Sequence, residues 1–184
     1  MSRALDARPP AARIAPGTAL GRYLDRTREY GFGRFVAEMT LLALALRIPA
    51  VWLAVQLGVA EDATTALDLL EQYPVELLVG LALVGAPILE TVLFQWFPIA
   101  LVRRVGGSAA AAAVASAVLF AALHFQSGLA AVLVHVPTGL VLAWSYLAFR
   151  HAGLGRALAA PAAVHFLLNL LAVAAALSRF GQGT

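Results

Sequence analysis

The feature that most constrains this chain is a series of five long apolar segments. Each approaches the ~20 residues that a helix needs to cross the hydrocarbon core of a bilayer. Inside lipid the backbone must satisfy its own hydrogen bonds, so segments of this kind span as helices. The sequence therefore predicts an all-α, polytopic transmembrane helix bundle of about five spans. The five apolar segments run from Phe35 to Val59, Val75 to Val102, Gly107 to Phe125, Leu129 to Phe149 and Leu158 to Leu177.

The composition excludes a water-soluble enzyme. Hydrophobic residues make up 61% of the 184 residues and charged residues only 12%, about half the ~25% of a soluble domain. Too little polar surface is left to cover a soluble core. The chain has no cysteine, which excludes disulfides and thiolate metal sites. The net charge of +3 is interpreted as marking the cytoplasmic side of the bilayer rather than a nucleic-acid partner.

The distribution of arginine predicts the orientation. Seven of the 13 arginines lie in residues 1–34, and the links after the second and fourth segments also carry them, whereas the other two links have none. Cytoplasmic loops are enriched in basic residues, so we expect a cytoplasmic N-terminus and an external C-terminus. Residues 1–34 are predicted to be an Arg-rich cytoplasmic tail and residues 35–184 a membrane-embedded domain. The link from Glu61 to Tyr73 is expected to be a short surface helix.

Several polar side chains lie deep within the apolar segments, where an ionisable group costs about 2.5–3.5 kcal/mol. Counting about 1.5 Å per residue from the cytoplasmic ends, Glu90 and Asn169 lie roughly 20 Å deep, His165 roughly 14 Å and His124 roughly 25 Å. His165 and Asn169 are four residues apart and share a helix face. A carboxylate, two imidazoles and a carboxamide at similar depth form a set suited to acid–base chemistry on water, which must have access to the site.

The same residues carry a family resemblance. The runs ETVLFQ (Glu90 to Gln95), FAALH (Phe120 to His124) and HFLLN (His165 to Asn169) resemble the motifs EExxxR, FxxxH and HxxxN/D of the CPBP family. That family comprises the CAAX prenyl endoproteases and the bacteriocin-processing or immunity proteins, also called ABI. The resemblance covers roughly Val75 to Leu177 and implies that the last four spans form a CPBP-type core.

The resemblance also implies a function and roles for residues. The chain is expected to be a glutamic intramembrane protease (a hydrolase) without a cofactor, acting on a membrane-associated protein or peptide in the lipid bilayer. Glu90 and His124 would activate water, and His165 and Asn169 would hold the oxyanion. The Ala-rich, Arg-only composition suits a GC-rich bacterial genome, so the expected location is the bacterial inner (plasma) membrane.

Two positions depart from the family motif. Thr91 stands where the motif has its second Glu, and Gln95 where it has Arg. Because the two are four residues apart, they are expected to lie on one helical stripe and to support the site as a neutral pair that can still hydrogen bond. Arg47, roughly 18 Å deep in the first span, is expected to face the bundle near this stripe. His135 belongs to no motif, and a packing role is favoured for it.

Four alternatives remain open at this stage. Glu90 could be structural, bonded to Arg47 or to a helix carbonyl. Two histidines and a glutamate also form a ligand set for zinc, although the family is regarded as glutamic. The chain could be a non-catalytic member of the family with an immunity or membrane-partner role. A small transporter would use similar buried polar groups, but no internal repeat is visible.

Overall fold

The computed structural model describes residues 31–59 and 73–180, and within these ranges all regular structure is helical. This confirms the prediction of an all-α fold. The segments η1 and η2 are π-helical turns, while η3 and η4 are 3-10 turns. In chain order the elements are α2 (Phe32–Gln56), α4 (Val75–Gly80), η1 (Leu81–Gly85), α5 (Ala86–Glu90), η2 (Thr91–Trp96), α6 (Phe97–Arg104), α7 (Ala109–Leu123), η3 (His124–Ser127), α8 (Gly128–Phe149), η4 (Arg150–Ala152) and α9 (Leu154–Phe180).

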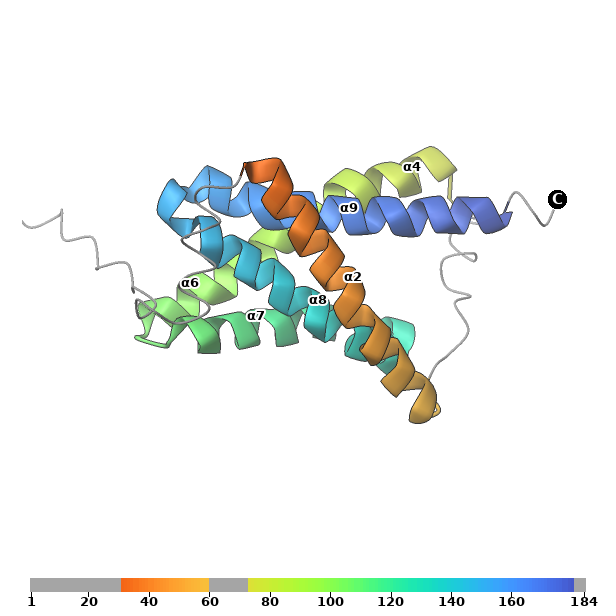
Figure 1. Ribbon diagram of the computed structural model, residues 1–184, viewed down its shortest axis with the longest axis horizontal. Coiled ribbons are helices and arrows are strands. Elements are labelled where there is room, and N and C mark those ends of the chain that lie inside the picture. The colour runs from red at the N-terminus through yellow and green to blue at the C-terminus, as the bar shows by residue number, and fades with distance from the viewer. Residues whose placement is uncertain (1–30, 60–72, 181–184) are drawn as a thin grey trace, which may run out of the picture.

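Four helical stretches are long and apolar enough to cross a membrane: Phe32–Gln56, Val75–Arg104, Ala109–Ala152 and Leu154–Ser178. The third has 44 residues, about twice what one crossing needs, and it folds back on itself at η3. There Gly128 has a φ of +89°, a backbone conformation that favours glycine. The helices α7 and α8 pack against each other as a hairpin (Figure 1). The stretches therefore supply the five predicted spans. The predicted tail and surface helix fall largely outside the described residues.

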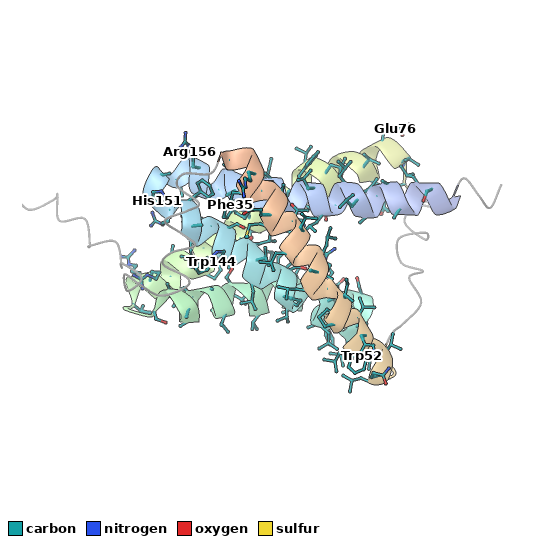
Figure 2. All side chains as sticks on the ribbon, in the orientation of Figure 1. Phe35, Trp52, Glu76, Trp144, His151 and Arg156 are labelled. Atoms are coloured by element: carbon teal, nitrogen blue, oxygen red, sulfur yellow. The ribbon has the colours of Figure 1, made fainter. Side chains whose placement is uncertain are left out.

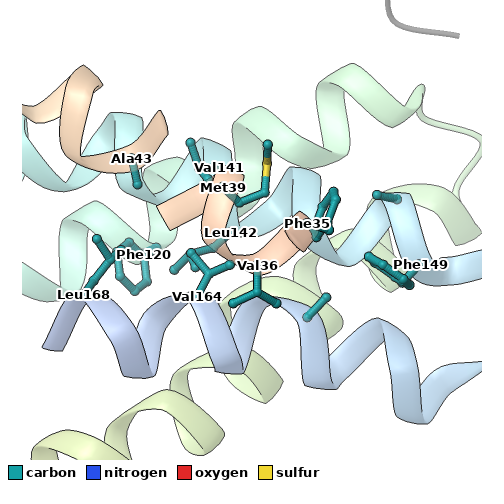
Figure 3. Close-up of a cluster of buried hydrophobic side chains, with 12 residues drawn as sticks. Phe35, Val36, Met39, Ala43, Phe120, Val141, Leu142, Phe149, Val164 and Leu168 are labelled. Atoms are coloured by element: carbon teal, nitrogen blue, oxygen red, sulfur yellow. The ribbon is translucent and has the colours of Figure 1, made fainter. Parts of the chain in front are cut away.

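The helix α8 lies at the centre of the bundle, in contact with α7, α2 and α9. Close approach to α7 depends on Gly139, where a Cβ would come within 2.8 Å of the Cα of Ala117. The helix α2 crosses obliquely over α8 (Figure 1), and η1, α5 and η2 contact α9. The main core is built by α2, α7, α8 and α9 (Figure 3), and comprises Phe35, Val36, Met39, Ala43, Phe120, Val141, Leu142, Ala148, Phe149, Ala160, Val164 and Leu168.

The two ends of the bundle differ in the segments they hold. His151 and Arg156, at the junction of α8 and α9, lie toward one end of the long axis (Figure 2). Trp52, near the end of α2, and Glu76, near the start of α4, lie toward the other end (Figure 2). Phe35 at the start of α2 packs edge-on against Phe149 at the end of α8, with ring centroids 4.9 Å apart. The start of α2 and the α8–α9 junction therefore share an end, as the arginine pattern requires.

Candidate active site

The stretch Val75–Arg104 positions Glu90 between two π-helical turns. At the end of η1 the N–H of Ala86 donates to the carbonyl of Leu81. At the end of η2 the N–H of Phe97 donates to the carbonyl of Val92. These are bonds to the fifth residue back, and each donor directly precedes a proline. Proline has no N–H and its ring crowds the preceding turn, and π bulges inside α-helices are frequent at functional sites.

Side chains from neighbouring helices bond one carbonyl in each π turn. The side-chain amide of Asn169, in α9, donates a hydrogen bond from Nδ2 to the carbonyl of Ala82, at a distance of 2.8 Å. Ser116 of α7 donates its hydroxyl to the carbonyl of Phe94. In a regular α-helix the Phe94 carbonyl would instead accept from residue 98, which is a proline. The stretch Val75–Arg104, called the broken stretch below because two π turns interrupt it, is therefore held by α7 and α9 on either side of Glu90.

Glu90 faces His165 across the gap between α5 and α9. The Glu90 Oε2 and His165 Nε2 atoms are 3.8 Å apart, and His165 is only 5% exposed. The Oε2 atom of Glu90 and the Nδ1 atom of His165 are buried and have no hydrogen-bond partner. Buried polar groups are normally satisfied, so these two atoms are open to a water or a substrate group. Because His165 and Asn169 both reach the Val75–Arg104 stretch, their expected common face is confirmed.

An aromatic cluster joins His165 to His124. The ring of Phe120, in α7, meets the ring of His165 nearly edge-on with centroids 5.6 Å apart. The same phenyl ring lies 5.1 Å from the ring of His124. His124 is the first residue of η3, so it stands at the turn of the α7–α8 hairpin, and its Nδ1 lies 3.0 Å from the carbonyl of Phe120. Two of the predicted site residues, His124 and His165, therefore contact one phenyl ring.

His135, for which the sequence favoured packing alone, belongs to this cluster. Its ring stacks on the ring of His124 with centroids 3.6 Å apart and planes 11° apart. It also lies 5.9 Å from the ring of Phe120. The signal that could have found it is the short link around Gly128, because a tight hairpin brings residues at similar distances from its turn side by side. Phe120 is eight residues before Gly128 and His135 seven residues after it. No motif includes this residue.

The expected pair of Thr91 and Gln95 does not form a hydrogen bond. Both side chains are buried, at 1% and 0% exposed. The Oγ1 atom of Thr91 and both amide atoms of Gln95 lack a partner. The expectation assumed α-helical spacing, whereas residues 91–96 form a π turn. Their supporting role remains a prediction.

Arg47 faces the bundle, but with a different partner from the one expected. Its Nε donates a hydrogen bond to the hydroxyl of Thr138, at a distance of 3.0 Å, and Thr138 in α8 is fully buried. Within residues 31–59 and 73–180 no carboxylate lies within ion-pair distance of Arg47, so it is not bonded to Glu90. Arg47 therefore joins α2 to α8 rather than contacting the Thr91–Gln95 pair.

The described ranges contain no group of three histidine, aspartate or glutamate side chains placed to hold a metal ion. Glu90 and His165 approach each other, and the ring of Phe120 contacts His165, His124 and His135. The arrangement offers a partly buried carboxylate beside an imidazole, with a second imidazole in contact with the same phenyl ring as the first. Such groups can accept a proton from water and donate hydrogen bonds to a developing anion.

Comparison with known proteins identifies the family of this chain. No curated protein and no solved structure gave a significant match to the chain. A family model described as type II CAAX prenyl endopeptidase Rce1-like matches residues 73–171. That range covers more than half of the chain and contains Glu90, His124, His165 and Asn169, while Arg47 lies outside it. The chain is an integral membrane protein that belongs to the Rce1-like family of type II CAAX prenyl endopeptidases.

Proposed function

We propose that this protein is an intramembrane endopeptidase that hydrolyses a peptide bond with water activated by Glu90 and a histidine. The observation that carries the proposal is the buried, unpartnered Glu90 Oε2 at 3.8 Å from His165 Nε2. A buried carboxylate without a hydrogen-bond partner is costly. Its retention beside an imidazole inside apolar helices is typical of a functional site.

The proposed reaction needs only side chains of this chain and one water molecule. Glu90 accepts a proton from the water while the water oxygen forms a bond to the scissile carbonyl carbon. His124 assists as a second acceptor of the water proton. His165 and the second amide hydrogen of Asn169 stabilise the resulting oxyanion. The carbon–nitrogen bond then breaks, and the leaving amine takes the proton back from Glu90. Oxyanion donors of this kind are worth about 2.7–4 kcal/mol each.

The proposed substrate is a membrane-associated protein or peptide. The groups assigned to the reaction lie on helices long and apolar enough to cross a bilayer, so a scissile bond that is held at the membrane reaches them most directly. A prenylated C-terminus is the substrate class that the family name indicates; a bacteriocin precursor or a segment of another membrane protein would fit the same chemistry. We place the chain in a bacterial inner membrane with its N-terminus in the cytoplasm.

The test compares membranes that contain the wild-type chain with membranes that contain Glu90→Gln. Peptides released from native membrane proteins should appear with the wild type and disappear with the variant. Glu76, which is exposed at the start of α4, provides the matched control, because Glu76→Gln changes the same functional group outside the site. Purified full-length protein with a quenched farnesylated peptide serves as the in vitro assay. Identical peptide patterns from the wild type and Glu90→Gln would refute the proposal.

The same in vitro assay distinguishes a glutamic from a zinc mechanism. Chelation by EDTA or phenanthroline should leave cleavage unchanged if Glu90 and the histidines act only as acids and bases. A zinc enzyme would lose its Lewis acid, and added zinc would restore cleavage. That outcome would reassign His124 and His165 as metal ligands and end the glutamic assignment.

A second candidate function is a non-catalytic member of the family, such as an immunity or membrane-partner protein. The observation that favours it is the loss of both motif charges at Thr91 and Gln95, which leaves buried polar groups without partners. If this alternative holds, the protein with Glu90→Gln would have the full biological effect of the wild type in cells. The two candidates therefore give opposite results in the same variant.

A further inference from the structure

We propose that His135 is a positioning residue that holds the imidazole of His124 in its working orientation. The inference rests on the proposed function, because it concerns the histidine assigned to assist Glu90. His135 lies in α8, outside the three sequence motifs, and it makes the closest ring contact of the cluster. The centroids of His124 and His135 are 3.6 Å apart, compared with 5.1 to 5.9 Å for the contacts that Phe120 makes.

The backbone fixes one nitrogen of each ring. His124 Nδ1 lies 3.0 Å from the carbonyl of Phe120, and His135 Nδ1 lies 2.7 Å from the carbonyl of Ala131. A carbonyl oxygen only accepts, so in a neutral ring Nδ1 carries the hydrogen and Nε2 keeps its lone pair. This is the tautomer that a water-activating histidine needs, because the free Nε2 can take a proton from water.

The hydrogen bond at Nδ1 fixes one atom of the His124 ring, but the plane of the ring can still rotate about the direction of that hydrogen bond. The stack against His135 removes this freedom, since the two planes are only 11° apart. Phe120 contacts both of these rings and also the ring of His165. His124 stands at the hairpin turn, where its own helix ends, so the neighbouring helix α8 supplies the support that α7 cannot. A misplacement of even 1 Å lowers the rate of an oriented reaction strongly.

Thr138 extends the same supporting surface on α8. It lies three residues after His135, on the same side of the helix, and accepts a hydrogen bond from Arg47 of α2. The side of α8 that carries His135 is therefore held by α2 as well as by the hairpin. This explains how a partly exposed segment near a turn can keep a stacked ring in place.

The experiment replaces His135 in the full-length chain and measures cleavage of the quenched farnesylated peptide. His135→Phe keeps a flat ring for the stack, whereas His135→Leu keeps apolar bulk without a flat ring. The Leu variant should lower kcat by about tenfold or more with an unchanged KM, and the Phe variant should restore most of the loss. His135→Met provides a second non-planar variant if the Leu variant does not fold. Val136→Ala, at the next residue of α8, is the matched control.

A spectroscopic measurement tests the same inference without relying on activity. In protein labelled with ¹⁵N-histidine, the His124 ring should give the signals of a single tautomer in the wild type and in His135→Phe. Averaged signals are expected in His135→Leu. In a His124→Ala background, adding His135→Leu should cause no further loss of residual cleavage, because the two residues act as one unit. Equal kcat and unchanged His124 signals in a folded Leu variant would overturn the inference.

These measurements also separate the inference from the proposed function. If the wild type and Glu90→Gln cleave alike, the proposed function fails, and the ring-nitrogen signals alone decide whether His135 orders His124. If Glu90 is required while His135→Leu has wild-type kcat, the protease assignment stands and the positioning role is refuted.

Discussion

The stretch Val75–Arg104 and the helix α9 carry facing halves of the candidate site, but they are built differently. Both contain proline within the span, yet α9 remains one α-helix through Pro161, as do α2 through Pro49 and α8 through Pro137. Among the prolines of residues 31–59 and 73–180, only Pro87 and Pro98 accompany π turns. Proline is therefore not sufficient to convert a turn of these helices to π geometry.

The difference lies in the side-chain donors near the carbonyls that would face a proline. In the Val75–Arg104 stretch, the carbonyl of Phe94, four residues before Pro98, accepts a hydrogen bond from Ser116. The carbonyl of Ala82, which faces Pro87 five residues later in the π register, accepts one from Asn169. Within the described residues no side-chain donor reaches the carbonyl of Ala157, four residues before Pro161. An unsatisfied carbonyl in an apolar setting is costly. We infer that a proline together with a donor from a neighbouring helix stabilises the π turn and so sets the position of Glu90.

The largest expected effect is the loss of the carboxylate from the broken stretch. Glu90→Gln should abolish cleavage while the bundle stays folded, because Gln has the shape of Glu but cannot take a proton. Catalytic rate and thermal unfolding, measured on the same purified preparation, separate the two properties. Glu76→Gln should match the wild type in both. A Glu90→Gln variant that cleaves at even a tenth of the wild-type rate would contradict the assignment of the general base.

The second effect, on the α9 side, is expected to be smaller but still large. Asn169→Ala should lower kcat by about 10²–10³, the cost of one oxyanion donor, and should leave measurable activity because the base is intact. The variant also removes the bond to the Ala82 carbonyl, so the melting temperature should fall modestly. A loss of stability with unchanged kcat would show that Asn169 only supports the π turn.

The sequence predicted the regular part of this molecule better than the irregular part. The spans, and the shared face of His165 and Asn169, follow from apolar length and from α-helical spacing, and α9 obeys that spacing. The expected hydrogen bond between Thr91 and Gln95 does not form, although both side chains are buried in the π turn. Spacing within one helix also could not reveal His135, whose stack with His124 depends on how two helices fold back on each other. Contacts between helices, not patterns within them, decide these features.

A third effect, of about 1 kcal/mol, tests the origin of the π turns directly. Ser116→Ala removes the donor to the Phe94 carbonyl and should destabilise the protein by about 0.5–1.5 kcal/mol. Pro98→Ala restores the N–H that an α-helix would direct at the same carbonyl. In the Pro98→Ala background, Ser116→Ala should therefore cost much less, which a double-mutant cycle of unfolding free energies can measure. Additive costs would show that the two features are independent.

The smallest expected effect concerns the two buried polar side chains that follow Glu90. Thr91→Val and Gln95→Met remove polar atoms that have no partner and keep similar volumes, so the free energy of unfolding should change by less than about 1 kcal/mol. Cleavage should fall far less than in Glu90→Gln, because neither residue is asked to move a proton. A marked loss of stability in either variant would mean that these atoms are satisfied in the membrane, for example by an internal water. The broken stretch would then be stabilised along its length by polar contacts, and the contrast with α9 would extend beyond the two π-turn carbonyls.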